Sequence, residues 1–225
     1  MKNYSFALVL FISTFLLNSC DTKEDVSNTH PAVARYKTVG HQIPTDVGMR
    51  WIDLYNQKNQ TQNRIGLSAY SIDDNLLSDL GESVENLTGV AFHYGIDDEG
   101  TQHIIAIPVD ETLRLWTSVP GRIYIDANTS TVISQEVAEE WAENFRDANP
   151  NSIWFHYFGQ NVLTDILASS SLARVDIIPA LSDLDFSPQL LLVLTTSLDL
   201  LDLGRTNAET PIYDASYPCP RCEVQ

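Results

Sequence analysis

A pattern that recurs at a nearly constant spacing constrains the fold of this chain more than any other feature. Ile43 stands eight residues before Trp51, and Ile133 stands eight residues before Trp141. The two pairs are therefore offset by 90 residues. Internal repetition of this kind defines the structural unit from which the fold is built.

A second match follows, in which apolar and polar residues correspond one by one. Residues 75–80 (NLLSDL) match residues 161–166 (NVLTDI) at an offset of 86. Further matches join residues that begin or precede apolar runs: Val90 with Val175, and Gln102 with Gln189. The sequence therefore predicts two copies of about 80 residues each. A chance match between two amphipathic segments is the alternative.

Each copy begins with a predicted helix followed by a strand. In the second copy Ser134 is a good N-cap, apolar residues follow at helical spacing, and Asn149-Pro150 ends the helix. The aromatic-rich residues 153–158 then favour a strand. In the first copy Thr45 and residues 65–70 take the corresponding places, with a weaker apolar pattern.

A second helix and two apolar runs complete each copy. In the first copy this helix is expected to begin near Ser71, whose spacing to Asp74 resembles a capping box. Residues 97–100 (DDEG) predict a hairpin loop with Gly100 in the left-handed conformation. The apolar runs are 90–96 with 103–109, and 175–181 with 190–195.

The predicted fold class follows from this order of elements. It is α+β, built as two α-β-α-β-β repeats with antiparallel hairpins. Repeat one is expected at residues 41–120. Repeat two is expected at residues 121–225, with a cysteine-containing C-terminal tail.

The N-terminus has the pattern of an export signal. Lys2 precedes a mostly apolar run, residues 6–17, which is shorter than the roughly 20 residues of a membrane-spanning helix. The run ends in residues 17–20 (LNSC), which resemble the lipobox of bacterial lipoproteins, although Asn18 is larger than the usual residue there. We therefore expect residues 1–19 to be a signal peptide and Cys20 to carry lipid such as palmitate. Residues 20–40 would then form a lipidated tether. An ordinary secretory signal with a chance cysteine is the alternative.

The acidic residues that follow Cys20 carry a further resemblance. Residues 21–25 (DTKED) resemble the export signals of Bacteroidota surface lipoproteins. This resemblance implies a lipid-anchored protein of the cell envelope, at the outer membrane, and leaves open whether it faces the periplasm or the outside.

The second copy is also similar to known proteins. Residues 132–225 resemble uncharacterised exported Bacteroidota proteins, through Ile133, Trp141, Ala148-Asn149-Pro150, Tyr157-Phe158-Gly159 and Val162–Leu167. Many of those proteins end in a segment like residues 218–222 (PCPRC). The resemblance implies no activity and no catalytic residues.

The charge balance excludes some classes of partner. Thirty acidic residues outnumber thirteen basic ones, which gives a net charge of −17. Such a surface repels the phosphates of nucleic acids and the headgroups of anionic lipids. Contact with a membrane is therefore expected only through the lipid on Cys20.

Cys219 and Cys222 form a C-x-x-C pair that allows three interpretations. A redox pair needs a helix N-terminus to activate a thiolate, and a zinc site needs further ligands. A local disulfide in an oxidising compartment, or a pair of free thiols, makes the fewest demands. We predict the disulfide without a catalytic role.

Other candidates have a plain structural explanation. His93 and His103 are expected to be diagonal neighbours across a hairpin, within reach of a metal ion but more simply two exposed edge residues. Ser68 lies in a near match to a nucleophile elbow, in which Tyr70 replaces the second glycine. The acidic clusters 97–99 and 183–185 are expected to be solvated turns, because neither has EF-hand spacing.

Two functions stay open at this level. The sequence favours a non-catalytic lipoprotein that binds a protein or small-molecule partner, with no catalytic residue, metal or other cofactor assigned. A lipid-anchored hydrolase that uses a pair of carboxylates is the alternative, because such pairs follow no spacing rule.

Overall fold

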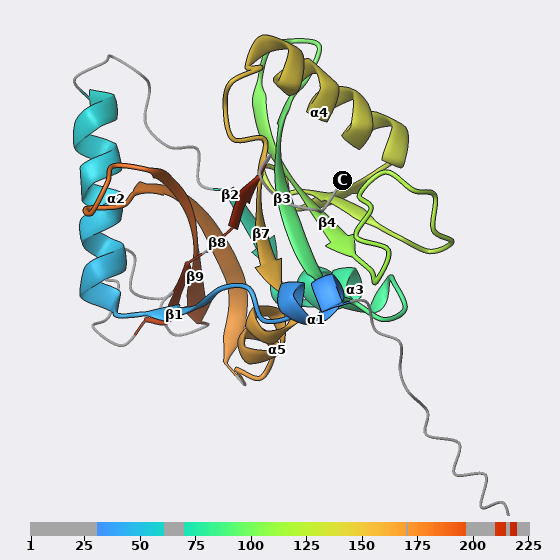
Figure 1. The fold of residues 1–225 in the computed structure, drawn as a ribbon, viewed down its shortest axis with the longest axis horizontal. Helices are drawn as coiled ribbons and strands as arrows, with labels where there is room; N and C mark the ends of the chain where they lie inside the picture. The colour runs from blue at the N-terminus through green and yellow to red at the C-terminus, as the bar shows by residue number, and fades with distance from the viewer. Residues whose placement is uncertain (1–30, 61–69, 170, 197–209, 215–216, 220–225) are drawn as a thin grey trace, which may run out of the picture.

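The computed structural model describes residues 31–60, 70–169, 171–196, 210–214 and 217–219 (Figure 1). Over this part of the chain, helices accompany two antiparallel sheets, so the predicted α+β class is confirmed. The elements follow one another as α1 (Pro31–Tyr36), β1 (His41–Ile43), α2 (Thr45–Gln60), β2 (Tyr70–Asp73), α3 (Asp74–Glu82), β3 (Gly89–Ile96), β4 (Gln102–Val109), β5 (Tyr124–Asp126), β6 (Thr131–Ile133), α4 (Gln135–Ala148), β7 (Phe155–Gly159), α5 (Gln160–Leu167), β8 (Leu172–Leu181), β9 (Pro188–Thr196), β10 (Ile212–Asp214) and β11 (Tyr217–Cys219).

Each sheet combines strands from both halves of the chain. One sheet has the order β1-β10-β9-β8-β2, and the other has the order β11-β7-β3-β4-β5-β6. Strand β2 of the first half thus pairs with β8, whereas β7 of the second half pairs with β3. The two long helices also pack against strands of the opposite half: α2 of the first half packs against β8, and α4 of the second half packs against β3. Both sheets therefore depend on both halves of the chain.

The two long hairpins are formed as the sequence predicts. In β3–β4, His93 pairs with Ile105 and Gly95 pairs with His103, so the two histidines are diagonal neighbours. Gly100 has a φ of +81°, the left-handed conformation that its place in the loop demands. Strands β8 and β9 form the corresponding hairpin near the end of the second half.

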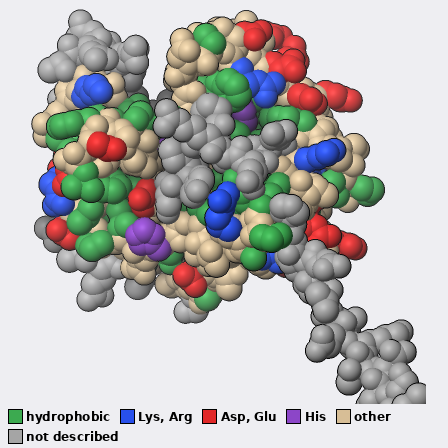
Figure 2. All heavy atoms as spheres, in the orientation of Figure 1, with side chains coloured by type: hydrophobic (Ala, Val, Ile, Leu, Met, Phe, Trp, Pro, Cys, Tyr) green, Lys and Arg blue, Asp and Glu red, His purple; other side chains and the backbone are tan. Residues whose placement is uncertain are grey.

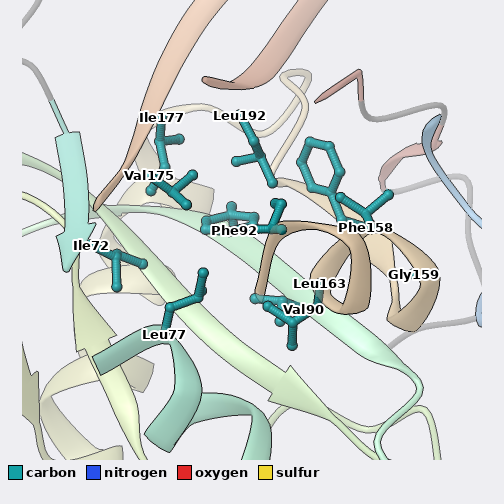
Figure 3. A pocket seen from close by; sticks show the side chains of 12 residues that line it. Ile72, Leu77, Val90, Phe92, Phe158, Gly159, Leu163, Val175, Ile177 and Leu192 are labelled. Atoms are coloured by element: carbon teal, nitrogen blue, oxygen red, sulfur yellow. The ribbon is translucent and has the colours of Figure 1, made fainter. Parts of the chain in front are cut away.

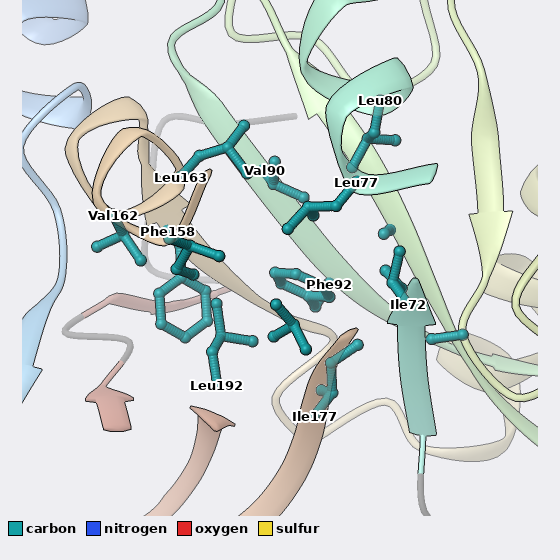
Figure 4. Close-up of a cluster of buried hydrophobic side chains, with 14 of the residues drawn as sticks. Ile72, Leu77, Leu80, Val90, Phe92, Phe158, Val162, Leu163, Ile177 and Leu192 are labelled. Carbon is teal, nitrogen blue, oxygen red and sulfur yellow. The ribbon is translucent and has the colours of Figure 1, made fainter. Parts of the chain in front are cut away.

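The main hydrophobic core lies between the two sheets (Figure 4). It joins Phe92 of one sheet to Leu192 of the other, and Leu77 of α3 and Val162 of α5 complete it. Smaller clusters lie beneath α4 and beneath α2. Burying each such side chain contributes about 1.5–3 kcal/mol relative to leaving it exposed, so this layer accounts for much of the stability.

Residues 31–40 do not form part of a tether, contrary to the prediction for residues 20–40. Residues 31–36 form α1, and Val33, Tyr36 and Val39 are buried in the core. A helix of six residues is too short to leave a periodic pattern in the sequence, which is why the prediction missed it.

The helix ends are predicted better in the second half than in the first. Ser134 caps α4 by accepting a hydrogen bond from Val137 N–H at 3.3 Å, and Asn149 ends that helix, as expected. Thr45, in contrast, starts α2 but donates its hydroxyl to the Thr210 carbonyl at 2.9 Å. Ser71 lies in β2 rather than at a helix start, because pairing with β8 extends that strand as far as Asp73.

Candidate functional site

The loop between β8 and β9 is fixed by hydrogen bonds among its own residues. Ser182 N–H donates to the Ser187 carbonyl, and Phe186 N–H donates to the Ser182 carbonyl, both at 3.0 Å. The Asp185 carboxylate accepts from the Ser187 hydroxyl at 2.6 Å and from the Ser187 N–H at 3.1 Å. These two bonds lower the pKa of Asp185, so its carboxylate is charged at neutral pH.

Helix α2 holds the same loop from outside. The Asp183 carboxylate accepts from Arg50 Nε at 2.6 Å and from Trp51 Nε1 at 2.8 Å. The bond from Arg50, followed by that from Trp51, lowers the pKa of Asp183. Asp46 lies 3.7 Å from the Arg50 guanidinium. In Figure 1 the turn between β8 and β9 accordingly crosses α2. The loop is thus anchored to a helix as well as to its own strands.

Two large apolar side chains project from this fixed loop into solvent. Leu184 is 88% exposed and Phe186 is 61% exposed. The backbone beneath them is held, because Leu184 N–H donates to Ser182 Oγ at 3.2 Å. In Figure 2 apolar side chains gather on the side of the molecule formed by α2 and this turn. We name residues 182–187 the hairpin tip.

A second polar cluster is centred on His103. Its Nδ1 lies 3.0 Å from Asp126 Oδ1 and its Nε2 lies 3.2 Å from Asp97 Oδ2. The Trp141 ring stacks on the imidazole at a centroid distance of 4.1 Å. Burial by itself raises the pKa of Asp97. Hydrogen bonds from Thr101 N–H, His103 and Glu99 N–H outweigh that effect and lower it.

This cluster ties structural elements together and leaves no reactive group free. Both ring nitrogens of His103 are engaged by carboxylates, so neither faces a nucleophile or a substrate. Asp126 also accepts from Asn128 N–H and from the Thr129 hydroxyl. The arrangement joins the β3–β4 loop to β5 and places α4 over both.

Two further strand histidines, His93 and His156, are buried, whereas His41 in β1 is exposed. His93 is 1% exposed, between Trp116 and Phe155, and burial lowers its pKa to about 4. His156 is fully buried, and burial lowers its pKa to about 3. The expectation that His93 and His103 are exposed edge residues is therefore wrong. Strand β7 continues the sheet beyond β3, and α4 covers its outer face.

A small cavity lies within the main core, between the two sheets (Figure 3). Its volume is about 10 Å³, and it is lined by apolar side chains including Phe92, Phe158 and Leu192. Such a space is about the size of one water molecule, and its apolar walls offer water no partner. Organic ligands need pockets of about 300 Å³ or more. The cavity is thus a packing defect rather than a binding pocket, and none of its lining residues is a carboxylate.

Several residues singled out from the sequence lie beyond the reach of the structure. Cys20, Ser68 and Cys222 are outside the described residues, and of Cys219 only the backbone is described, in β11. The proposed lipidation and the proposed disulfide therefore stay predictions. Within the described ranges, no three His, Cys, Asp or Glu side chains are grouped to hold a metal ion.

The sequence predicts a turn at the hairpin tip from Asp183 and Asp185, but the prediction did not include the exposure of Leu184 and Phe186. A signal was available, because the matching loop of the first copy (residues 97–101, DDEGT) contains no large apolar residue. Comparing the two loops position by position would have shown the difference.

No protein-family model, curated protein or solved structure matches this chain. Among the helices that the structure describes, none is long and apolar enough to cross a membrane.

Proposed function

We propose that this chain is a lipoprotein of the bacterial cell envelope, anchored at the outer membrane by lipid on Cys20. Its folded part binds a protein partner and catalyses no reaction. The anchor rests on the short apolar run that ends in residues 17–20 (LNSC). The binding role rests on one structural observation, the fixed hairpin tip that exposes Leu184 and Phe186.

A protein partner is favoured over a small molecule. The cavity in the core is far too small for an organic ligand and has no polar group to orient one. The hairpin tip, in contrast, presents apolar side chains outward, as a protein interface requires. The carboxylates of Asp97 and Asp126 offer no free pair to the alternative hydrolase, because both engage His103.

The anchor is tested by replacing Cys20 with serine in cells that express the whole chain. The variant is expected to lose labelling by a palmitate analogue and to leave the membrane fraction, because serine offers no thiol for the lipid. The unchanged chain serves as the reference. A serine variant that is still labelled and still sediments with membranes contradicts the proposed anchor.

We further propose that the two halves are copies of one unit that have exchanged segments. Strand pairing supports this proposal, because the pairing of β2 with β8 corresponds residue by residue to the pairing of β7 with β3. Ile72 pairs with Val175, and the residues matched to them, Phe158 and Val90, also pair. Such exchange is the intramolecular counterpart of domain swapping between two identical chains.

The edge strands correspond as well if the boundary between the halves is moved from residue 120 to the turn between β5 and β6. Ile43 in β1 pairs with Ile212, and its match Ile133 in β6 pairs with Tyr124. One sequence match needs adjustment. Leu181, which corresponds to Ile96, pairs with Pro188, whereas Ile96 pairs with Gln102. Gln102 therefore corresponds to Pro188 rather than to its neighbour Gln189.

A further inference from the structure

The β3–β4 and β8–β9 loops differ in length by one residue, but each has a left-handed residue just before it closes. In the first loop Gly100 N–H donates to the Asp97 carbonyl, three residues back, and in the second Phe186 N–H donates to the Ser182 carbonyl, four residues back. Both donors stand one residue before the loop closes. Gly100 has a φ of +81° and Phe186 has a φ of +57°. A phenylalanine thus occupies the left-handed position that glycine occupies in the related loop.

Folding alone gives no reason for this choice. Glycine adopts a positive φ at no steric cost, whereas a bulky residue there is an outlier that costs stability. Leu113 is the other large residue with a positive φ among those described, and it is buried in the core, which rewards its place. Phe186 is mostly exposed and gains no comparable packing. The strained backbone of Phe186 is not compensated by packing in the core, which points to a role in contacting another molecule.

The hairpin tip is suited to binding because it is already ordered. Its backbone is fixed by its own hydrogen bonds and by α2, so little conformational entropy remains to be lost on association. Leu184 stands two residues from Phe186, so both exposed apolar side chains belong to the same short turn. Aromatic anchors of this kind supply a large share of interface energy.

The charges around the tip restrict what it can meet. Asp183 precedes the apolar pair and Asp185 lies between its two members. Asp46 lies near Arg50, the one cation that the described contacts bring to this network. Anionic lipid headgroups and a second copy of a chain of net charge −17 would both be repelled. A protein partner with an apolar socket and a rim of lysine or arginine residues would complement the hairpin tip.

We propose that Leu184 and Phe186 dock together into an apolar socket bordered by lysine or arginine residues on a protein partner in the envelope. This rests on the binding role proposed above and specifies its surface and partner chemistry. The carboxylate of Asp185 faces the basic rim, whereas that of Asp183 stays bound to Arg50 and Trp51 of α2. The left-handed Phe186 backbone holds its ring outward for insertion.

The experiment uses a photo-cross-linking amino acid placed in the whole chain, in living cells. It is incorporated in turn at Leu184, at Asp98 in the related loop, and at Val132, an exposed apolar residue of β6. A specific protein adduct is expected from position 184 and not from the control positions 98 and 132. The partner is then identified, purified and titrated against the purified chain.

Three substitutions separate binding from folding. Phe186→Gly restores the residue of the related loop, so it should leave the melting temperature unchanged or raise it while weakening the partner's affinity at least tenfold. Val132→Ser removes an exposed apolar residue of similar kind and should leave affinity unchanged. Asp185→Asn should weaken binding and flatten its dependence on salt concentration.

The possible failures are distinct. An adduct from position 98 or 132 but not from 184 leaves the binding role standing and overturns the hairpin tip as its surface. An adduct with lipid, or with a second copy of the chain, overturns the proposed partner class. If no position yields a protein adduct, the binding role itself is wrong. Wild-type affinity in the Phe186→Gly variant also refutes the proposal.

Discussion

His156 places a titratable imidazole ring in the core without a hydrogen-bond partner among the described residues. Within the described residues, neither of its ring nitrogens has a hydrogen-bond partner, and the nearest aromatic ring that contacts it edge-on is Tyr94, at 5.9 Å. A buried polar group without a partner costs about 1–3 kcal/mol. Burial also opposes its charging, so the native state keeps this histidine neutral well into the acid range.

This predicts a specific acid sensitivity. Below the ordinary histidine pKa of 6.5 the unfolded chain binds a proton at His156, whereas the native chain does not until the pH nears the folded pKa of about 3. Stability is thus fully present above pH 6.5 and falls as the pH falls between these limits. The slope is up to about 1.4 kcal/mol per pH unit. His156→Leu should remove this slope and cost little at pH 8, measured as urea unfolding free energy against pH.

His93 is the matched comparison. Its pKa is also lowered by burial, to about 4, but its Nδ1 is hydrogen-bonded to the Tyr94 carbonyl at 2.7 Å. His93→Leu should flatten the acid slope as well, yet lose stability at pH 8 because that carbonyl loses its partner. An unchanged slope in the His156 variant would show that its ring is protonated or solvated in the native state.

At the scale of elements, each long helix rests on the hairpin of the other half. Trp51 of α2 donates to Asp183 in the β8–β9 loop. Trp141 of α4 stacks on His103, which in turn contacts Asp97 in the β3–β4 loop. The two tryptophans thus join helix to hairpin at corresponding places, although Trp51 is buried and Trp141 is half-buried.

Truncating either tryptophan should disturb the hairpin that it contacts. Trp51→Ala is expected to cost about 3–5 kcal/mol of unfolding free energy, and Trp141→Ala to fall at the lower end of that range because it is less buried. Amide hydrogen exchange should accelerate at residues 182–187 in the first variant and at residues 97–101 in the second. Asp53→Ala and Glu140→Ala, exposed on the same helices, are the controls.

The proposed duplication predicts that each tryptophan stabilises the hairpin loop of the other half. If Trp51→Ala loosens its own half's β3–β4 loop instead of the β8–β9 loop, the two helices do not play equivalent parts. The proposed duplication then loses its main structural support.

At the scale of the whole molecule, the two halves cannot unfold separately. Strand β2 completes the sheet of β8 and β9, and β7 joins the sheet of β3 and β4. Loss of either half therefore exposes the core that both sheets share. The chain is held together as one cooperative unit, even though its sequence divides into two similar parts.

The expected outcome is a single thermal transition for the chain that carries Cys20→Ser. Its calorimetric enthalpy should equal its van't Hoff enthalpy, which is the test of two-state unfolding. Two resolved transitions, or a calorimetric enthalpy well above the van't Hoff value, would show instead that the halves fold independently.

Local patterns in the sequence were sufficient to predict the long hairpins and α4, but not the short elements α1, β1, β5, β6, β10 and β11. The apolar runs 90–96 and 103–109 correspond to β3 and β4, and the loop chemistry at Gly100 set their register. Ser134 and Asn149 marked the ends of α4 for the same reason. Capping, turn conformation and strand alternation depend on neighbours a few residues apart, so they can be read directly from the chain.

The candidate site was predicted only in part. Asp183 and Asp185 were recognised as turn residues, but the exposure of Leu184 depends on how α2 holds the loop. The burial of His93 likewise depends on β7 and α4, which are more than 40 residues away in sequence. Exposure and burial are set by distant segments, and no local pattern encodes them.

The sequence by itself therefore determined the α+β class, the two long hairpins and the ends of α4. Only the tertiary structure decided that β2 pairs with β8 and β7 with β3, that residues 31–40 join the core, and that Leu184 and Phe186 face solvent. The physical reason is the range of the interactions. Backbone conformation and periodicity act over a few residues, whereas strand partners and burial are chosen by contacts between segments far apart in the chain.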